Sequence, residues 1–319
     1  MTGEQKRNAA LALIAECGSH LRTLSDAQAV RDMVTQLTER AWALQGGPKD
    51  RPYLTRTMSQ LAHVLRSSGW VEMACSTLEW TVEHGAQDGH VLSEIAECHL
   101  ARGDREGAER ILDRARAAGL PTDAIYTSLV KAYGRAGQPE RARQLFDRAR
   151  ADGAATTFTY PALIAAYGAA GDVAGASCAF DRARADGQLS APCFTALATA
   201  FAGAGEVAAV ERVLALARQS GHMSARLAYA AIKVRLNNGQ FGAARRLLDE
   251  AKLDGVADVQ CYQAIIIACH RAGRHREAKR VFASASTDPH LTADDLRRAR
   301  CAHHKRGSSS APDVAQMAA

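Results

Sequence analysis

Residues 124–153 read AIYTSLVKAYGRAGQPERARQLFDRARADG, two short amphipathic stretches that each end near a glycine. The first of these glycines belongs to a series that recurs every 34 residues: Gly69, Gly103, Gly137, Gly171, Gly205, Gly239 and Gly273. The second belongs to another series with the same spacing: Gly85, Gly119, Gly153, Gly187, Gly221 and Gly255. Two separate series with one period indicate a tandem structural repeat. Because glycine adopts the left-handed conformation at little cost, we expect each of these glycines to end a helix.

The apolar side chains keep the same period. In the second stretch Ala142, Phe146 and Ala149 follow the i, i+4, i+7 spacing that places side chains on one face of a helix. In the first stretch Leu129 lies eight residues before the glycine, and most repeats carry leucine or isoleucine at that place. We therefore predict two helices in each of seven repeats, which span 55–88, 89–122, 123–156, 157–190, 191–224, 225–258 and 259–292.

A single helix pair cannot bury its apolar stripes, whereas stacked pairs can. The sequence thus predicts an all-α fold, an α-solenoid of tandem helix-turn-helix repeats that forms a superhelix with a concave face. Residues 1–54 are expected to hold N-terminal capping helices, at about 4–22 and 26–45, and a linker marked by Gly46, Gly47, Pro48 and Pro52. Residues 293–306 are expected to form a C-terminal capping helix and 307–319 a disordered tail.

Composition narrows the class of protein. The net charge of +6 over 319 residues is a mild basic excess, which permits contact with nucleic acid without requiring it. Eight cysteines occur without a CxxC pair, which favours a reducing compartment over a disulfide framework. No run approaches the roughly 18 apolar residues that a membrane span needs, and no secretory signal opens the chain. We expect no membrane partner.

Motifs for catalysis do not stand out. The sequence has no glycine-rich phosphate loop, nucleophile elbow or paired carboxylates. The pairs Cys98–His99 and Cys269–His270 are interpreted as packing positions, with cysteine acting as a small hydrophobic residue. Cys301 and the nearby histidines lack a second ligand pair at metal spacing. We therefore predict a protein that is not an enzyme, with no catalytic residue, cofactor, metal or small-molecule substrate.

Residues 124–153 resemble a pentatricopeptide repeat. The aromatic residue near the start of the first helix, the AYGRAG end of that helix and the glycine after the second helix carry the resemblance. Residues 157–187 share all three features, and 261–282 share the first two. The rival family is the tetratricopeptide repeat, whose typical period is also 34. Its glycine inside the first helix and its proline after the second are absent here. The pentatricopeptide period is usually one residue longer, so the resemblance implies a trimmed turn between repeats.

The resemblance implies binding of single-stranded RNA, at about one base per repeat. In the family the fifth and last residues of each repeat read the base. These positions give as candidates Ser59, Ser93, Thr127, Thr195 and Gln263 at the fifth place and Asp88 at the last. Only Ser59 with Asp88 keeps the usual family pattern, and Pro161 has no side-chain donor, so low sequence specificity is expected.

Phosphate contacts require cations on the first helix of each repeat. The candidates are Arg56, Arg66, Lys131, Arg135, Lys233 and Arg271. Arg135 and Arg271 match the basic residue that the family places two residues before the turn glycine. The arginines of the second helices alternate with aspartates and are expected to form a solvent face.

The predicted function is non-enzymatic binding of single-stranded RNA along the concave face. The alternative is a protein-protein interaction scaffold of the tetratricopeptide type that binds a protein ligand, and a variant of either is a bacterial protein delivered into a host cell. The expected location is the cytoplasm for a bacterial protein, with an organelle (mitochondrion or plastid) or secretion into a host cell as alternatives.

Overall fold

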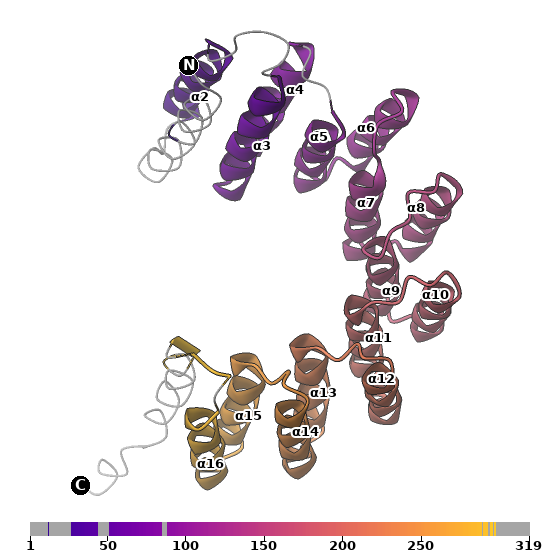
Figure 1. Cartoon of the computed structure of the whole chain (residues 1–319), viewed down its shortest axis with the longest axis vertical. Coiled ribbons are helices and arrows are strands. Elements are labelled where there is room, and N and C mark those ends of the chain that lie inside the picture. Colours follow the sequence, from indigo (N-terminus) through magenta and orange to yellow (C-terminus); the bar gives the residue numbers. More distant parts are fainter. Residues whose placement is uncertain are drawn as a thin grey trace, which may run out of the picture. The chain divides into compact units, whose positions relative to one another are not determined.

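The computed structural model describes residues 27–43, 51–84 and 88–288, together with 12, 290–292, 294, 295 and 297. Every regular element in this part of the chain is an α-helix (Figure 1), which confirms the all-α prediction. The helices are α2 (Ala27–Ala43), α3 (Arg51–Ser67), α4 (Val71–Glu83), α5 (Gly89–Ala101), α6 (Arg105–Ala117), α7 (Asp123–Arg135), α8 (Pro139–Ala151), α9 (Thr159–Ala169), α10 (Val173–Ala185), α11 (Ala191–Gly203), α12 (Val207–Gln219), α13 (Ala225–Asn237), α14 (Phe241–Leu253), α15 (Val259–Arg271) and α16 (His275–Ser286). None of the helices within the described residues is both long and apolar enough to cross a membrane.

The chain forms two compact units, Met1–Thr159 and Tyr160–Ala319. Within the first unit the first helices of successive repeats, α3, α5 and α7, contact one another in turn. The second helices α4 and α6 each pack between their own first helix and the next one. The second unit repeats this arrangement with α11, α13 and α15. Each unit is therefore a stack of helix pairs, as predicted for tandem helix-turn-helix repeats.

Glycines of both series end the helices. Gly137 follows α7 with φ +69°, and Gly153 follows α8 with φ +68°. The backbone N–H of Gln138 donates to the carbonyl of Tyr133 across 3.0 Å, the hydrogen bond that closes a helix after a left-handed residue. All other described glycines of the two series also have positive φ, which confirms the predicted helix ends.

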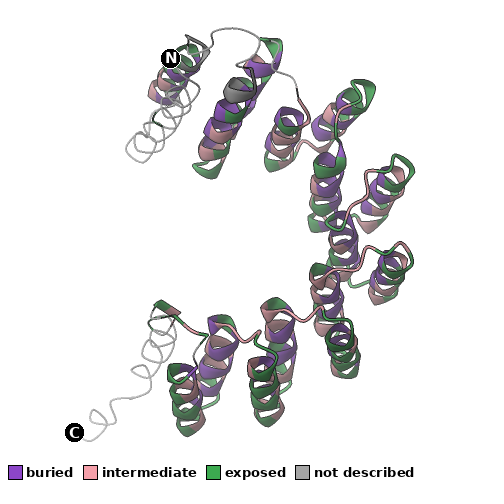
Figure 2. Cartoon of the chain, in the orientation of Figure 1, coloured by how far each residue is buried: buried purple, intermediate pink, exposed green. Residues whose placement is uncertain are grey.

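The predicted apolar stripes form the core. Leu129, Phe146 and Ala149 are fully buried, and so is Tyr126 near the start of α7. Figure 2 shows buried residues along the sides where helices meet and exposed residues on the opposite sides. This packing leaves one face of each helix exposed to solvent.

Prolines shift two helix starts from their expected places. We expected Pro52 to mark a linker, but it is the second residue of α3, which begins four residues before the predicted repeat boundary at 55. In the first turn of a helix the backbone N–H has no helical acceptor, so proline loses nothing there. For the same reason α9 begins at Thr159, which makes Pro161 its third residue.

The predicted end regions are described only in part. Helix α2 coincides with the segment expected at about 26–45. Apart from single positions, the helices expected at 4–22 and 293–306 and the tail 307–319 lie outside the described residues.

Candidate nucleic-acid interface

Four exposed cations lie at equivalent positions of the first helices, two in each unit. Lys131 and Arg135 lie four residues apart on α7, so their side chains leave the same side of the helix, and both are exposed. Neither forms an ion pair with any residue that the structure describes. In the second unit Lys233 on α13 and Arg271 on α15 occupy the same repeat positions, the ninth and the thirteenth, and share both properties.

Two arginines at equivalent places on second helices form ion pairs with aspartates. Arg116 of α6 contacts Asp152, the residue that ends α8, with 2.6 Å between Nε and Oδ2. In the second unit Arg218 of α12 reaches Asp254 in the same way, with 2.8 Å between Nη2 and Oδ2. The hydrogen bond with Asp152 raises the pKa of Arg116 and, together with one from Tyr126, lowers the pKa of the aspartate. These arginines link successive second helices and are occupied by that contact.

Two further first-helix arginines differ from each other. Arg56 is exposed on α3, as a phosphate contact requires. Arg66, near the end of the same helix, pairs with Glu94 at 3.3 Å and Glu97 at 3.0 Å on α5. The prediction that Arg66 serves RNA is therefore weakened, because its charge joins the first helices of two repeats.

The fifth-position side chains point less toward solvent than the family comparison implied. Ser59 is 3% exposed and Thr127 is 7% exposed, so neither hydroxyl reaches an open face. Oγ1 of Thr127 lies 3.0 Å from Oγ1 of Thr159. Ser93 donates to the carbonyl of Gly89, and Thr195 to that of Ala191, so these hydroxyls bond to their own helices. Gln263 is half-buried on α15.

Asp88, the last-position candidate, caps a helix. Its carboxylate accepts from the backbone N–H of Val91 across 2.9 Å at the start of α5. Ser224 and Asp258 cap α13 and α15 through the same bond. Because an N-cap residue satisfies an amide that the helix itself leaves without a partner, this role accounts for Asp88, Ser224 and Asp258. Thr122 and Ser190 stand at the same place before α7 and α11 but form no side-chain cap bond.

One exposed aromatic residue was missed in the sequence. Phe158 is 69% exposed, immediately before α9 and at the second position of the fourth repeat. The ninth and thirteenth positions of this repeat hold Ala165 and Ala169, so the recurrence of cations at these positions gave no signal for Phe158.

The buried thiols carry no sign of nucleophilic chemistry. Burial, as the largest cause, raises the pKa of Cys75 to about 12, that of Cys98 to about 11 and that of Cys261 to about 12. A reactive cysteine needs a lowered pKa and access to solvent. Cys98 and Cys261 are fully buried and therefore serve as packing residues, in line with the sequence interpretation of Cys98.

The chain is similar to known repeat proteins in sequence and in fold. The pentatricopeptide repeat model matches residues 124–153. A structure of the pentatricopeptide repeat protein PPR10 in complex with an 18-nt psaJ RNA element is 22% identical, covers 94% of this chain and 41% of that one, and has a TM-score of 0.54. PPR10 from maize is 24% identical, with 88% and 41% covered and a TM-score of 0.47.

The chain spans about two fifths of the length of these structures. None of the curated proteins matches the sequence. The likeness to the RNA-bound structure of PPR10 is one of fold. Residues 124–153 match the pentatricopeptide repeat model and lie in a tandem array of helix pairs that has the fold of a pentatricopeptide repeat protein.

Proposed function

We propose that this protein binds single-stranded RNA on the exposed face of its first helices, with low sequence specificity and without catalysis. The observation that carries the proposal is a set of exposed cations at two equivalent positions of the first helices. The cations at the ninth and thirteenth positions, Lys131, Arg135, Lys233 and Arg271, are exposed and without ion pairs among the described residues. Arg116 and Arg218 on the second helices are held by carboxylates.

The first helices and the residue before α9 together offer groups for both parts of a nucleotide. Lysine and arginine neutralise phosphates, which supplies affinity without reading sequence. Phe158 presents an exposed ring on which a base can stack, and stacking tolerates any base. Because Ser93 and Thr195 donate to their own helices, they are poor at discriminating between bases. That PPR10, which shares the fold, has been solved with an RNA element supports RNA as the ligand.

Salt dependence is the direct test. Single-stranded oligonucleotides of about 12 residues would exceed the roughly seven bases that seven repeats can address. If four cations each contact one phosphate, log affinity should fall with log salt at a slope of roughly −3. Fluorescence anisotropy from about 50 to 300 mM salt, with uridine-rich and adenosine-rich oligonucleotides, should give similar slopes and affinities.

A matched pair of double variants separates the two sets of helices. Replacing Lys233 and Arg271 by alanine should reduce the slope by about 1.4 for all oligonucleotides. Replacing Arg245 and Arg246, exposed on the second helix α14, removes the same charge and should leave the slope unchanged. Equal loss in both variants, or no binding at about 50 mM salt, would contradict the proposal. A protein partner that survives ribonuclease would instead favour the scaffold alternative.

A further inference from the structure

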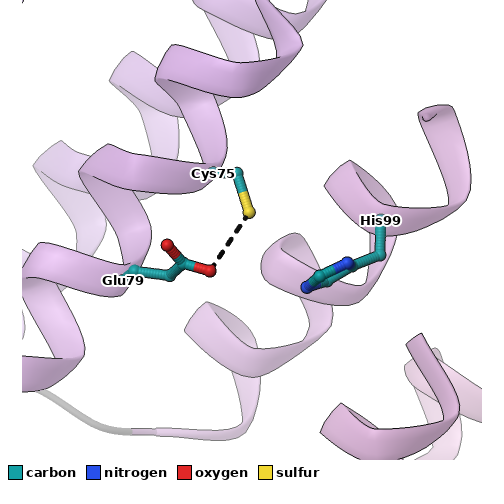
Figure 3. Close-up of side chains that lie close together, drawn as sticks. All are labelled: Cys75, Glu79 and His99. Atoms are coloured by element: carbon teal, nitrogen blue, oxygen red, sulfur yellow. Dashed lines mark hydrogen bonds between the residues drawn. The ribbon is translucent and has the colours of Figure 1, made fainter. Parts of the chain in front are cut away.

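Three side chains of metal-ligand type meet between the first two repeats. Cys75 and Glu79 lie one turn apart on α4, and His99 faces them from α5 (Figure 3). One ligand atom from each lies within 4.8 Å of the others. Sγ of Cys75 is 3.5 Å from Oε1 of Glu79. A tetrahedral Zn²⁺ with a Zn–S distance of about 2.3 Å and a Zn–O distance of about 2.0 Å holds sulfur and oxygen about 3.5 Å apart.

A carboxylate orients the imidazole of His99. Its Nδ1 lies 2.9 Å from Oδ2 of Asp104, and because a carboxylate only accepts, Nδ1 carries the proton. The other ring nitrogen, Nε2, is then the one with a free lone pair. Histidine ligands of metals ordinarily hold their second nitrogen in this way, which sets both tautomer and ring direction.

The surrounding backbone keeps this arrangement in place. The backbone N–H of Gly107 donates to Oδ1 of Asp104 across 2.8 Å. A Cβ atom on Gly107 would lie 2.1 Å from Oδ2 of Asp104 and 2.4 Å from Nδ1 of His99. Any side chain larger than hydrogen at 107 would therefore displace the histidine or its carboxylate. The side chain of His99 is 15% exposed, so its position is also restricted by packing.

The equivalent contacts at other junctions show what is distinctive here. The eleventh residue of a repeat meets the twenty-first of the repeat before it: Tyr133 bonds to Glu109, and Arg235 pairs with Glu211. In each of those pairs the two side chains bond directly to each other. At the first junction His99 and Cys75 occupy these places, yet Cys75 bonds to Glu79 and His99 to Asp104. The Cys75 thiol, Nε2 of His99 and the Glu79 carboxylate thus face one another as three possible metal ligands.

We propose that Sγ of Cys75, a carboxylate oxygen of Glu79 and Nε2 of His99 bind one Zn²⁺ ion. One sulfur, one nitrogen and one oxygen donor suit this borderline-soft cation, and a water molecule completes the tetrahedron. The Cys75 thiol releases its proton to solvent as the ion binds. The ion joins the second helix of the first repeat to the first helix of the second repeat. This site is separate from the RNA-binding face and does not depend on that proposal.

Cobalt titration of the full chain, after treatment with a chelator, tests the site. One equivalent of Co²⁺ should bind with the absorption of a tetrahedral site and a thiolate-to-cobalt charge-transfer band, and Zn²⁺ should displace it. Cys75→Ser should abolish the charge-transfer band. Cys178→Ser, which removes an exposed cysteine of α10, should leave it unchanged. Glu79→Gln changes an exposed side chain, so it should keep the fold while weakening binding.

The supporting carboxylate gives a second readout. Asp104→Asn keeps an acceptor for the cap of α6 but removes the charge beside His99, and should weaken binding about 10- to 100-fold. Zn²⁺ should raise the unfolding temperature of the unaltered chain and not that of His99→Ala. The proposal is overturned if cobalt binds without the charge-transfer band or does not bind in a one-to-one ratio. It is also overturned if Cys75→Ser and Glu79→Gln bind cobalt as tightly as the unaltered chain.

Discussion

The phenolic hydroxyl of Tyr126 donates a hydrogen bond to Oδ2 of Asp152 across 2.5 Å. The bond ties the start of α7 to the residue that ends α8, so it closes one helix pair on itself. Other repeats contain the same bond between their fourth and thirtieth residues: Tyr160–Asp186 at 2.6 Å and Tyr262–Asp288 at 2.5 Å. In the fifth repeat, Phe194 at the fourth position accompanies Ser220 at the thirtieth, so loss of the donor goes with loss of the carboxylate.

Tyr126→Phe tests how much this bond stabilises a repeat. The substitution removes the hydroxyl and leaves the fully buried ring in place, so we expect a loss of roughly 1–3 kcal/mol in the free energy of unfolding. Urea unfolding followed by circular dichroism measures it. Tyr229→Phe is the matched control, because the structure gives Tyr229 no hydrogen bond with a described residue. Equal effects from the two variants would contradict a specific role for the Tyr126–Asp152 bond.

Asp152 makes part of the stability depend on pH. Hydrogen bonds from Arg116 and Tyr126 lower the pKa of its carboxyl in the folded chain. A carboxyl whose pKa is lower when folded stabilises the fold above its unfolded pKa of about 3.9 and loses that contribution as pH falls through the folded value. The destabilisation caused by Asp152→Asn should therefore be larger at pH 6 than at pH 3. Chemical unfolding at both pH values measures this loss. An equal loss at pH 6 and pH 3 would show that the charge of Asp152 does not contribute to stability.

Gly137→Ala tests the left-handed turn that separates α7 from α8. Space is available, since a Cβ at Gly137 meets no atom within 4 Å, but φ is +69°. The expected cost is therefore conformational, about 1–2 kcal/mol. Gly242→Ala is the control, because this glycine lies within α14, is equally open and does not have positive φ. Alanine there should be neutral or stabilising by up to about 1 kcal/mol. A thermal shift assay that ranks the two variants in the opposite order would contradict the assignment.

The 34-residue period of the sequence predicted the features that depend on neighbouring residues within a repeat, namely helix ends and buried stripes. Gly137 and Phe146 could be placed because a helix end and a buried stripe depend on residues within one or two turns. The roles of Arg66 and Tyr126 could not, because each depends on a partner 26 to 31 residues away on another helix. Asp88 was read as a base contact, although its position before a helix also fits a cap. The candidate cations were chosen because each lies on a first helix, and only the structure separates the exposed Lys131 from the paired Arg66.

Phe146 and Arg148 lie on opposite faces of α8 and test the assignment of its buried stripe. Phe146 is fully buried, so Phe146→Ala should cost roughly 3–5 kcal/mol through lost burial and the cavity that remains. Arg148 forms an ion pair with Asp113 of α6 at the surface, and Arg148→Ala should cost at most about 1 kcal/mol. Urea unfolding of both variants at moderate and high salt would also show the arginine effect shrink with salt and the phenylalanine effect persist. A larger loss for Arg148→Ala than for Phe146→Ala would mean that the ion pairs between second helices, and not the apolar stripe, hold the repeats together.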